Sequence, residues 1–305
     1  MKTLLPLLLL CACAGSLVDH AGVSLSAPDG GSQACLSTCT TDVAGATARC
    51  DGDVCTYQCP AGKFKAAGGC HEATEISGGA SHTCAVVSGE ARCWGANDKG
   101  QLGRDIPATG SFIPTSPAGL PSGGIVSHVA AGAAHTCAIV DGNVWCWGDN
   151  GSGQLGNGTT TASTAGVPYQ VANVAGAQLI AAGGAHTCAA NATKTYCWGN
   201  DSFGQLGDGA TLPGAPRPEA TEVPGAAGAL ALAAGDSHTC AITSAGVRCW
   251  GANGAGQLGN GSLVPALATP VPTSPALTGA SFLGLGMNHS CAGVGDSLSC
   301  WGANG

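Results

Sequence analysis

A fifty-residue repeat constrains this chain more than any other feature. The string His-Thr-Cys, once His-Ser-Cys, is followed nine residues later by a second cysteine in Cys-Trp-Gly, and the pattern occurs five times. Such a period indicates a repeat architecture, in which one unit stacks on the next. Because a catalytic site is one constellation and not five copies, we expect the repeated residues to serve the scaffold. The repeats are marked by His82, His135, His186, His238 and His289.

The composition favours turns and short strands. Of 305 residues only 9% are charged, against about 25% in an ordinary soluble domain, and 51 are glycine. The net charge is −8, and the sequence has no run of basic residues. Because phosphate neutralisation needs clustered lysine and arginine, nucleic acid is excluded as an expected partner.

The first 13 residues read as an export signal. Lys2 precedes a short apolar run, Leu4 to Leu10, which is too short to span a bilayer. Leu10-Cys11-Ala12-Cys13 resembles a bacterial lipobox, which predicts lipidation at Cys13; Cys11 is the weaker alternative. The other reading is plain secretion after cleavage near Ala14. We therefore expect a location in the bacterial cell envelope, at the outer surface or in the periplasm, or secretion, with membrane contact only through a lipid anchor.

A cysteine-rich segment follows the export signal. Residues 14–34 are small and polar and predict a flexible tether. Residues 35–71 are too few for a core of their own, so their six cysteines predict a mini-domain with three disulfides, for which fifteen pairings are possible. Zinc binding is the alternative, although the 18 cysteines of the chain indicate an oxidising compartment. The six are Cys35, Cys39, Cys50, Cys55, Cys59 and Cys70.

Residues 72–305 contain the repeats. Each repeat has three clear strand patterns and predicts a fourth strand. A short strand ends in glycine, a hairpin carries the two cysteines, and a Gly-Gln-Leu-Gly loop and a proline-containing stretch lead onward. Four strands per repeat are typical of a propeller blade. We place the units at about 72–124, 125–174, 175–226, 227–277 and, in part, 278–305.

The hairpin turn fixes which cysteines face each other. In the second repeat Asp141-Gly142 is a strong two-residue turn signal, so Val140 faces Asn143 and Cys137 faces Cys146. That pair falls on a non-hydrogen-bonded position, where the strands are closest and a disulfide fits. The turns at 192–193 and 244–245 are poorer, so a longer loop there is an alternative, as are free buried cysteines. The predicted pairs are Cys84–Cys93, Cys137–Cys146, Cys188–Cys197, Cys240–Cys249 and Cys291–Cys300.

The full pattern, Gly-x-x-His-Thr-Cys-Ala…Cys-Trp-Gly-x-Asn-x-x-Gly-Gln-Leu-Gly, resembles the regulator of chromosome condensation repeat. The resemblance implies an all-β fold, a β-propeller of about fifty-residue blades, usually seven. Here four units are complete, and the fifth stops before its Gly-Gln-Leu-Gly loop. The chain would then be a fragment, an open ring, or a ring completed by something else. The cysteine pairs suggest a secreted, disulfide-bearing variant, to which the nucleotide-exchange activity of the family cannot be transferred residue by residue.

Several motifs that suggest chemistry have structural readings. Equivalent positions on a ring should hold the five histidines far apart, so we expect each to hydrogen-bond a neighbouring turn and not to bind metal. We expect the tryptophans to pack between blades and the Gly-Gln-Leu-Gly loops to be turns, because the Lys-Ser/Thr of a phosphate-binding loop is missing. Asn97-Asp98 and Asn200-Asp201 lack the oxygen-rich loop of a calcium site. No metal, cofactor or catalytic residue is predicted.

Three functions remain in view. The first is a binding module for an unknown protein or envelope ligand, which uses the variable stretches 104–124, 157–174, 208–226 and 260–277. Inhibition of a secreted enzyme is one form of this function, because some bacterial propellers of this family resemble such inhibitors. The second is a propeller enzyme, a lyase or hydrolase, which would need converging charged residues that this chain has few of. The third is a passive structural lipoprotein.

Overall fold

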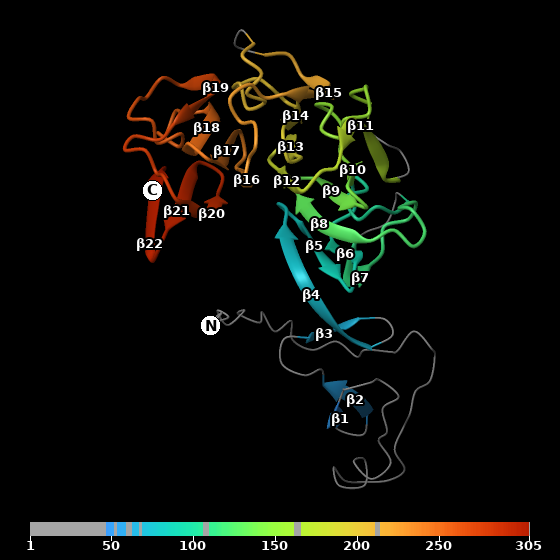
Figure 1. The fold of residues 1–305 in the computed structure, drawn as a ribbon. Coiled ribbons are helices and arrows are strands. Elements are labelled where there is room, and N and C mark those ends of the chain that lie inside the picture. Colours follow the sequence, from blue (N-terminus) through green and yellow to red (C-terminus); the bar gives the residue numbers. More distant parts are fainter. Residues whose placement is uncertain are drawn as a thin grey trace. The chain divides into compact units, whose positions relative to one another are not determined.

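Residues 71–305 form an all-β propeller of five blades in the computed structural model (Figure 1). The structure describes residues 47–51, 54–58, 63–66, 69–105, 110–161, 166–210 and 214–304. A blade is an antiparallel meander, in which consecutive strands pair from the inner first strand to the outer fourth. Within the described residues the regular elements are all strands, and none of the segments is a helix that could cross a membrane.

The strands of the first three blades have these bounds. Blade 1 contains β4 (Gly69–Gly78), β5 (His82–Val87), β6 (Glu90–Gly95) and β7 (Ser111–Thr115). Blade 2 contains β8 (Val126–Ala131), β9 (His135–Val140), β10 (Asn143–Gly148) and β11 (Tyr169–Ala175). Blade 3 contains β12 (Leu179–Ala182), β13 (His186–Ala190), β14 (Thr195–Gly199) and β15 (Arg217–Glu222).

The last two blades differ in strand number. Blade 4 contains β16 (Ala231–Ala234), β17 (His238–Thr243), β18 (Gly246–Ala252) and β19 (Ala266–Pro272). Blade 5 has three strands among the described residues: β20 (Ala280–Leu285), β21 (His289–Val294) and β22 (Ser297–Gly302).

Residues 1–70 form a separate compact unit, of which the structure describes only short strands. β1 (Thr47–Asp51) pairs with β2 (Val54–Gln58), with Cys50 opposite Cys55, and β3 (Lys63–Ala66) follows. The lipidation site Cys13, the tether 14–34 and Cys35, Cys39 and Cys59 lie outside the described residues. The pairing of the six cysteines in this segment stays a prediction.

The central hairpin of each blade has the register that its turn predicts. In blade 2, Val140 faces Asn143 and Cys137 faces Cys146. The same alignment occurs in every blade, and each cysteine pair forms a disulfide with Cα atoms 4.1 Å apart. Each bridge joins the second strand of its blade to the third. The five are Cys84–Cys93, Cys137–Cys146, Cys188–Cys197, Cys240–Cys249 and Cys291–Cys300.

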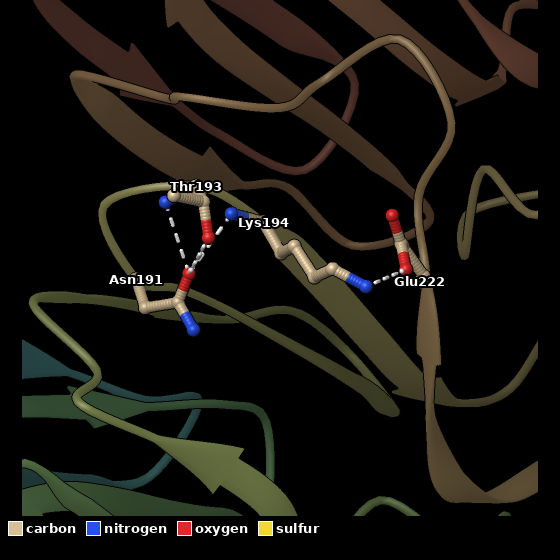
Figure 2. Close-up of polar contacts among 4 residues, drawn as sticks. All are labelled: Asn191, Thr193, Lys194 and Glu222. Atoms are coloured by element: carbon tan, nitrogen blue, oxygen red, sulfur yellow. Dashed lines mark hydrogen bonds and ion pairs between the residues drawn. The ribbon is translucent and has the colours of Figure 1, made fainter.

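Blade 3 keeps this register around a longer turn. Ala190 still pairs with Thr195, so the turn holds four residues instead of the two of blade 2. Figure 2 shows why it closes: the Asn191 Oδ1 accepts hydrogen bonds from the backbone N–H groups of Thr193, at 3.0 Å, and Lys194, at 2.9 Å. Lys194 Nζ then reaches Glu222 on β15, at 2.6 Å. The hydrogen bond to Glu222 raises the pKa of Lys194.

The hydrophobic core is shared between blades. The cluster of blade 2, which includes Cys137, Leu155 and Val171, also contains Trp198 and Ala189 of blade 3. Equivalent clusters join blade 1 to blade 2 and blade 3 to blade 4. Because a blade completes its core only with residues of the next blade, the stability of the propeller depends on the junctions between blades.

Candidate binding face and the blade junctions

Each junction is built around one repeated hydrogen-bond network, which we call the inter-blade clamp. Between blades 2 and 3, His135 Nε2 lies 2.9 Å from Thr187 Oγ1. Thr187 donates to the backbone carbonyl of Gln154 at 3.0 Å, and the Trp198 indole donates to that same carbonyl at 2.9 Å. The other three clamps are His82–Thr136–Gln101–Trp147, His186–Thr239–Gln205–Trp250 and His238–Ser290–Gln257–Trp301.

The clamp assigns the histidine tautomer. Since the Thr187 hydroxyl has one proton and gives it to Gln154, it must accept from His135, so His135 carries its proton on Nε2. Burial, and to a smaller extent the neighbouring histidines, lower the pKa of His135 and of His186 to about 3. These clamp histidines are therefore neutral at neutral pH, and they are engaged as donors at Nε2.

This arrangement corrects one prediction and confirms another. The histidines do not bond a neighbouring turn, because their partner is a hydroxyl on the second strand of the next blade. They are also not far apart, because each clamp histidine contacts the residue that follows the histidine of the next blade: His135 Nε2 lies 2.9 Å from the hydroxyl of Thr187, next to His186. The prediction that the tryptophans pack between blades is confirmed: Trp147, Trp198 and Trp250 are fully buried.

The Gly-Gln-Leu-Gly loop is a turn that also completes the clamp. Its glutamine supplies the carbonyl, and its leucine is buried in the core, as with Leu155. Gly156 has a φ of 66°, and a Cβ atom there would lie 2.9 Å from the Trp198 indole nitrogen. Only glycine allows both the left-handed turn and the approach of the next blade.

The two end blades lack one side of the clamp. In blade 1, Thr83 and Trp94 are partly exposed, whereas their equivalents Thr136 and Trp147 are fully buried. In blade 5, His289 and Cys300 are exposed. Among the described residues, the clamp is therefore formed at the four internal junctions and not between the last blade and the first.

The other candidate region is what we call the outer loops, which connect the third strand of each blade to the fourth. In a meander these loops emerge at one end of the blades, opposite the tight turns between the second and third strands. Seven large exposed apolar side chains lie in the outer loops and at the start of the strands that follow, while others, such as Ile125 and Leu230, lie elsewhere. The seven are Phe112, Ile113, Val167, Tyr169, Phe203, Leu263 and Val264.

Charged groups in the outer loops differ from blade to blade. Arg104 and Asp105 are exposed in blade 1, where they line a hollow of about 360 Å³ with Ser111. In blade 3, Arg217 pairs with Asp208, at 3.1 Å between Nη2 and Oδ2. Across the described residues no three histidine, cysteine or acidic side chains group as metal ligands would.

The sequence reasoning missed two sets of residues. The clamp hydroxyls were not recognised, although the last repeat gives a signal, because Ser290 replaces threonine and keeps the hydroxyl. Asp201 was considered only as a calcium ligand. Its carboxyl is fully buried, and burial raises its pKa to about 6. The signal is the order of two residues: Asp149-Asn150 in blade 2 becomes Asn200-Asp201 in blade 3.

Comparison with known protein families bears on the same repeats. The model described as "Regulator of chromosome condensation (RCC1) repeat" matches residues 88–139, 141–190 and 194–242, and a second model of that description matches 126–154 and 230–257. Together these matches cover more than half of the chain. The chain belongs to this repeat family.

Relatives with curated names share the repeats over part of their length. The chain is 33% identical to the "Ultraviolet-B receptor UVR8" of Arabidopsis thaliana, over 70% of this chain and 49% of that protein. It is 37% identical to the human "Probable E3 ubiquitin-protein ligase HERC6", over 60% of this chain and 19% of that protein. The chain thus spans half or less of the length of these relatives.

Solved structures agree on the fold. The propeller resembles human WBSCR16, with a TM-score of 0.66 and 23% identity over 76% of this chain and 62% of that one. It also resembles yeast RCC1 (Prp20), solved with Kap60 bound, with a TM-score of 0.65 and 23% identity over 76% and 56% of the two chains. At this identity the likeness shows the fold alone.

Proposed function

We propose that this chain is an extracytoplasmic protein-binding module that recognises its partner with the outer loops. One observation carries the proposal. The repeated polar residues are buried and hydrogen-bonded in the inter-blade clamps, while large apolar side chains are exposed on loops that differ between blades. Exposed apolar groups beside charged ones are typical of protein interfaces. Phe112 is fully exposed and Leu263 is 75% exposed, at opposite ends of the row of complete blades.

Related proteins support a protein partner. One solved structure of the yeast protein holds Kap60, and another is described together with its binding to Gsp1p and histones. These partners belong to that protein. For this chain they support only the use of the propeller as a surface for other proteins.

Inhibition of a secreted enzyme is a special case of the same proposal, with the enzyme as partner. A propeller enzyme, such as a lyase or hydrolase, is the competing proposal. The clamp histidines do not favour it, because burial holds the pKa of His135 at about 3 and its Nε2 is engaged as a donor. A general base works best with a pKa near the operating pH.

Exchange of outer loops tests the binding proposal. Chimeras that swap the outer-loop residues 157–168 with 208–216 should lose affinity for a partner isolated with the intact protein and should keep the melting temperature within a few degrees. The matched control swaps Asp141-Gly142 with Ser244-Ala245, the tight turns at the opposite end of the blades. Loss of binding in the control and not in the outer-loop chimeras would refute the assignment of the face.

We also propose that the chain is exported and acylated at Cys13, and that the disulfides form in the compartment it reaches. The five disulfides of the propeller support an oxidising environment. Intact-mass analysis of the membrane fraction should show loss of residues 1–12 and an added lipid. A soluble mature protein that starts elsewhere and has no lipid would rule out the anchor.

A further inference from the structure

Blade 3 departs from its neighbours at one buried position in its outer loop. Blades 2 and 4 have asparagine there, Asn150 and Asn253, and blade 3 has Asp201. All three side chains are fully buried. In each, Oδ1 accepts from the backbone N–H five residues later, at 3.1 Å in blades 2 and 3 and at 3.0 Å in blade 4. The difference lies at the other end of the side chain.

In blades 2 and 4 that end is an amide that donates to a ring of acceptors. Asn150 Nδ2 lies 3.1 Å from Asn157 Oδ1 and 3.0 Å from the carbonyl oxygen of Thr159. It also lies 2.9 Å from the carbonyl oxygen of Thr161. Asn253 Nδ2 donates to the Ser262 carbonyl oxygen at 2.8 Å. The buried amide therefore fastens the outer loop to the blade.

In blade 3 the same place holds a carboxylate oxygen. Asp201 Oδ2 is buried and has no hydrogen-bond partner among the described residues. Asp208 stands at the repeat position of Asn157, and its Oδ1 accepts from the Ala210 N–H at 2.9 Å. A carboxylate thus stands at the repeat position of the acceptor that the Asn150 amide bonds in blade 2, and its charge contributes to raising the pKa of Asp201.

Gly214 also lies against this oxygen. The N–H of Gly214 donates to the backbone carbonyl of Asp201 at 3.1 Å, and a Cβ atom at Gly214 would overlap Asp201 Oδ2. Two carboxylates close together in a buried site repel each other, and protonation of one of them removes this repulsion.

We propose that Asp201 is a proton-controlled latch for residues 208–210 of blade 3. When the carboxyl is protonated, its Oδ2–H takes the place of the asparagine amide and holds these residues against the blade; when the carboxyl is ionised, that hydrogen bond is lost. The groups that face it fit this assignment. Burial is the main reason that the pKa of Asp201 is raised to about 6; the hydrogen bond from the Leu206 N–H opposes it, the charge of Asp208 adds to it, and Arg217 opposes it. Arg217 is already paired with Asp208, so Asp201 is the carboxyl left without a counter-charge.

A bound cation is the competing way to fill the site. Calcium takes six to eight oxygen ligands, whereas the described part of this site offers two carboxylates, one of them already held by Arg217. The proton therefore fits the site better, and calcium becomes an outcome to test.

The test compares the melting temperature of the full chain with that of Asp201→Asn from pH 4 to pH 7.5. Asparagine mimics the protonated aspartate, so the two proteins should melt together near pH 4. Above pH 6 the variant should melt about 2–6 °C higher, because it keeps the latch. The clamp histidines destabilise both proteins equally in acid, so the difference between the curves isolates Asp201. Hydrogen exchange at the Ala210 amide should slow in the variant above pH 6.

The reciprocal change in blade 2 is the matched control. Asn150→Asp should lower the melting temperature of the protein as the pH rises. This loss should have the same sign and the same midpoint pH as the one attributed to Asp201. A pH-independent difference between Asp201→Asn and the parent would overturn the proposal. So would a rise in the melting temperature of the parent, and not of the variant, with millimolar calcium. Neither readout requires a partner, so failure of the latch and failure of the binding proposal are separate results.

Discussion

The blade junctions and the outer loops lie within a few residues of each other in every repeat, yet they differ in what they preserve. The junctions keep the same four groups, histidine, hydroxyl, carbonyl and indole, in the same hydrogen bonds at distances between 2.8 and 3.2 Å. The outer loops keep only their Gly-Gln-Leu-Gly base and vary beyond it. Residues that look chemically active but recur in every blade therefore serve assembly. We look for function at the positions where one blade differs from the others.

The strongest test of this comparison removes an indole from a junction. Trp198→Ala should destabilise the propeller by about 3–5 kcal/mol, because it leaves a cavity in the shared core and removes a donor from the Gln154 carbonyl. Chemical denaturation with the parent as reference measures this. The matched change Tyr169→Ala, at an exposed aromatic at the start of β11, should cost far less. Equal costs at the two sites would remove the distinction.

The disulfides should come next. Cys137→Ser opens a loop of about ten residues within one blade and should cost about 2–4 kcal/mol. Under reducing conditions the parent should lose at least as much, since it has five such bridges. A parent protein whose unfolding midpoint does not respond to reductant would show that the clamps alone hold the blades.

A third change isolates the hydroxyl of the clamp. Thr187→Val keeps the shape of the side chain but leaves the Nε2–H of His135 without its acceptor, at an expected cost of about 1–3 kcal/mol. Thr187→Ser retains the hydroxyl, as Ser290 does in the last junction, and should recover most of the loss. If serine behaves like valine, packing of the methyl group and not the hydrogen bond explains the effect.

Sequence reasoning reached the fold because the relevant signals are local and repeated. The turn at Asp141-Gly142 and the nine-residue spacing fix strand pairing within a blade, and the structure has the same register. The clamp was out of reach because it joins residues about fifty positions apart, as His135 and Thr187 are, and periodicity gives no account of which atom meets which. Asp201 was missed because its environment depends on Gly214, which lies thirteen residues further along the chain and packs against its carboxyl.

The latch in blade 3 predicts a smaller effect whose sign depends on pH. The pKa of Asp201 is about 6 in the folded protein and 3.8 as its ordinary value, so ionisation opposes folding. Stability from this group is present below pH 4 and is lost as the pH rises to 6. One pKa unit represents about 1.36 kcal/mol, so the difference between these two pKa values corresponds to about 3 kcal/mol. Because the loop lies near solvent, we expect about 1–2 kcal/mol of this. The free energy of unfolding of Asp201→Asn minus that of the parent should rise by this amount between pH 4 and pH 6.5.

The smallest effect on stability is expected where the effect on binding should be largest. Phe203 lies in the outer-loop turn of blade 3, 48% exposed, and its backbone N–H, not its ring, bonds Gln205. Phe203→Ala should therefore change stability by no more than about 0.5 kcal/mol. An aromatic anchor at the centre of an interface would cost about 2 kcal/mol or more of binding energy when truncated. Leu230→Ala, at an exposed apolar residue on the opposite end of the blades, controls for loss of apolar surface in general. Isothermal titration with the isolated partner separates the cases: an unchanged affinity for Phe203→Ala, together with a weakened Leu230→Ala, would move the binding face to the other end of the propeller.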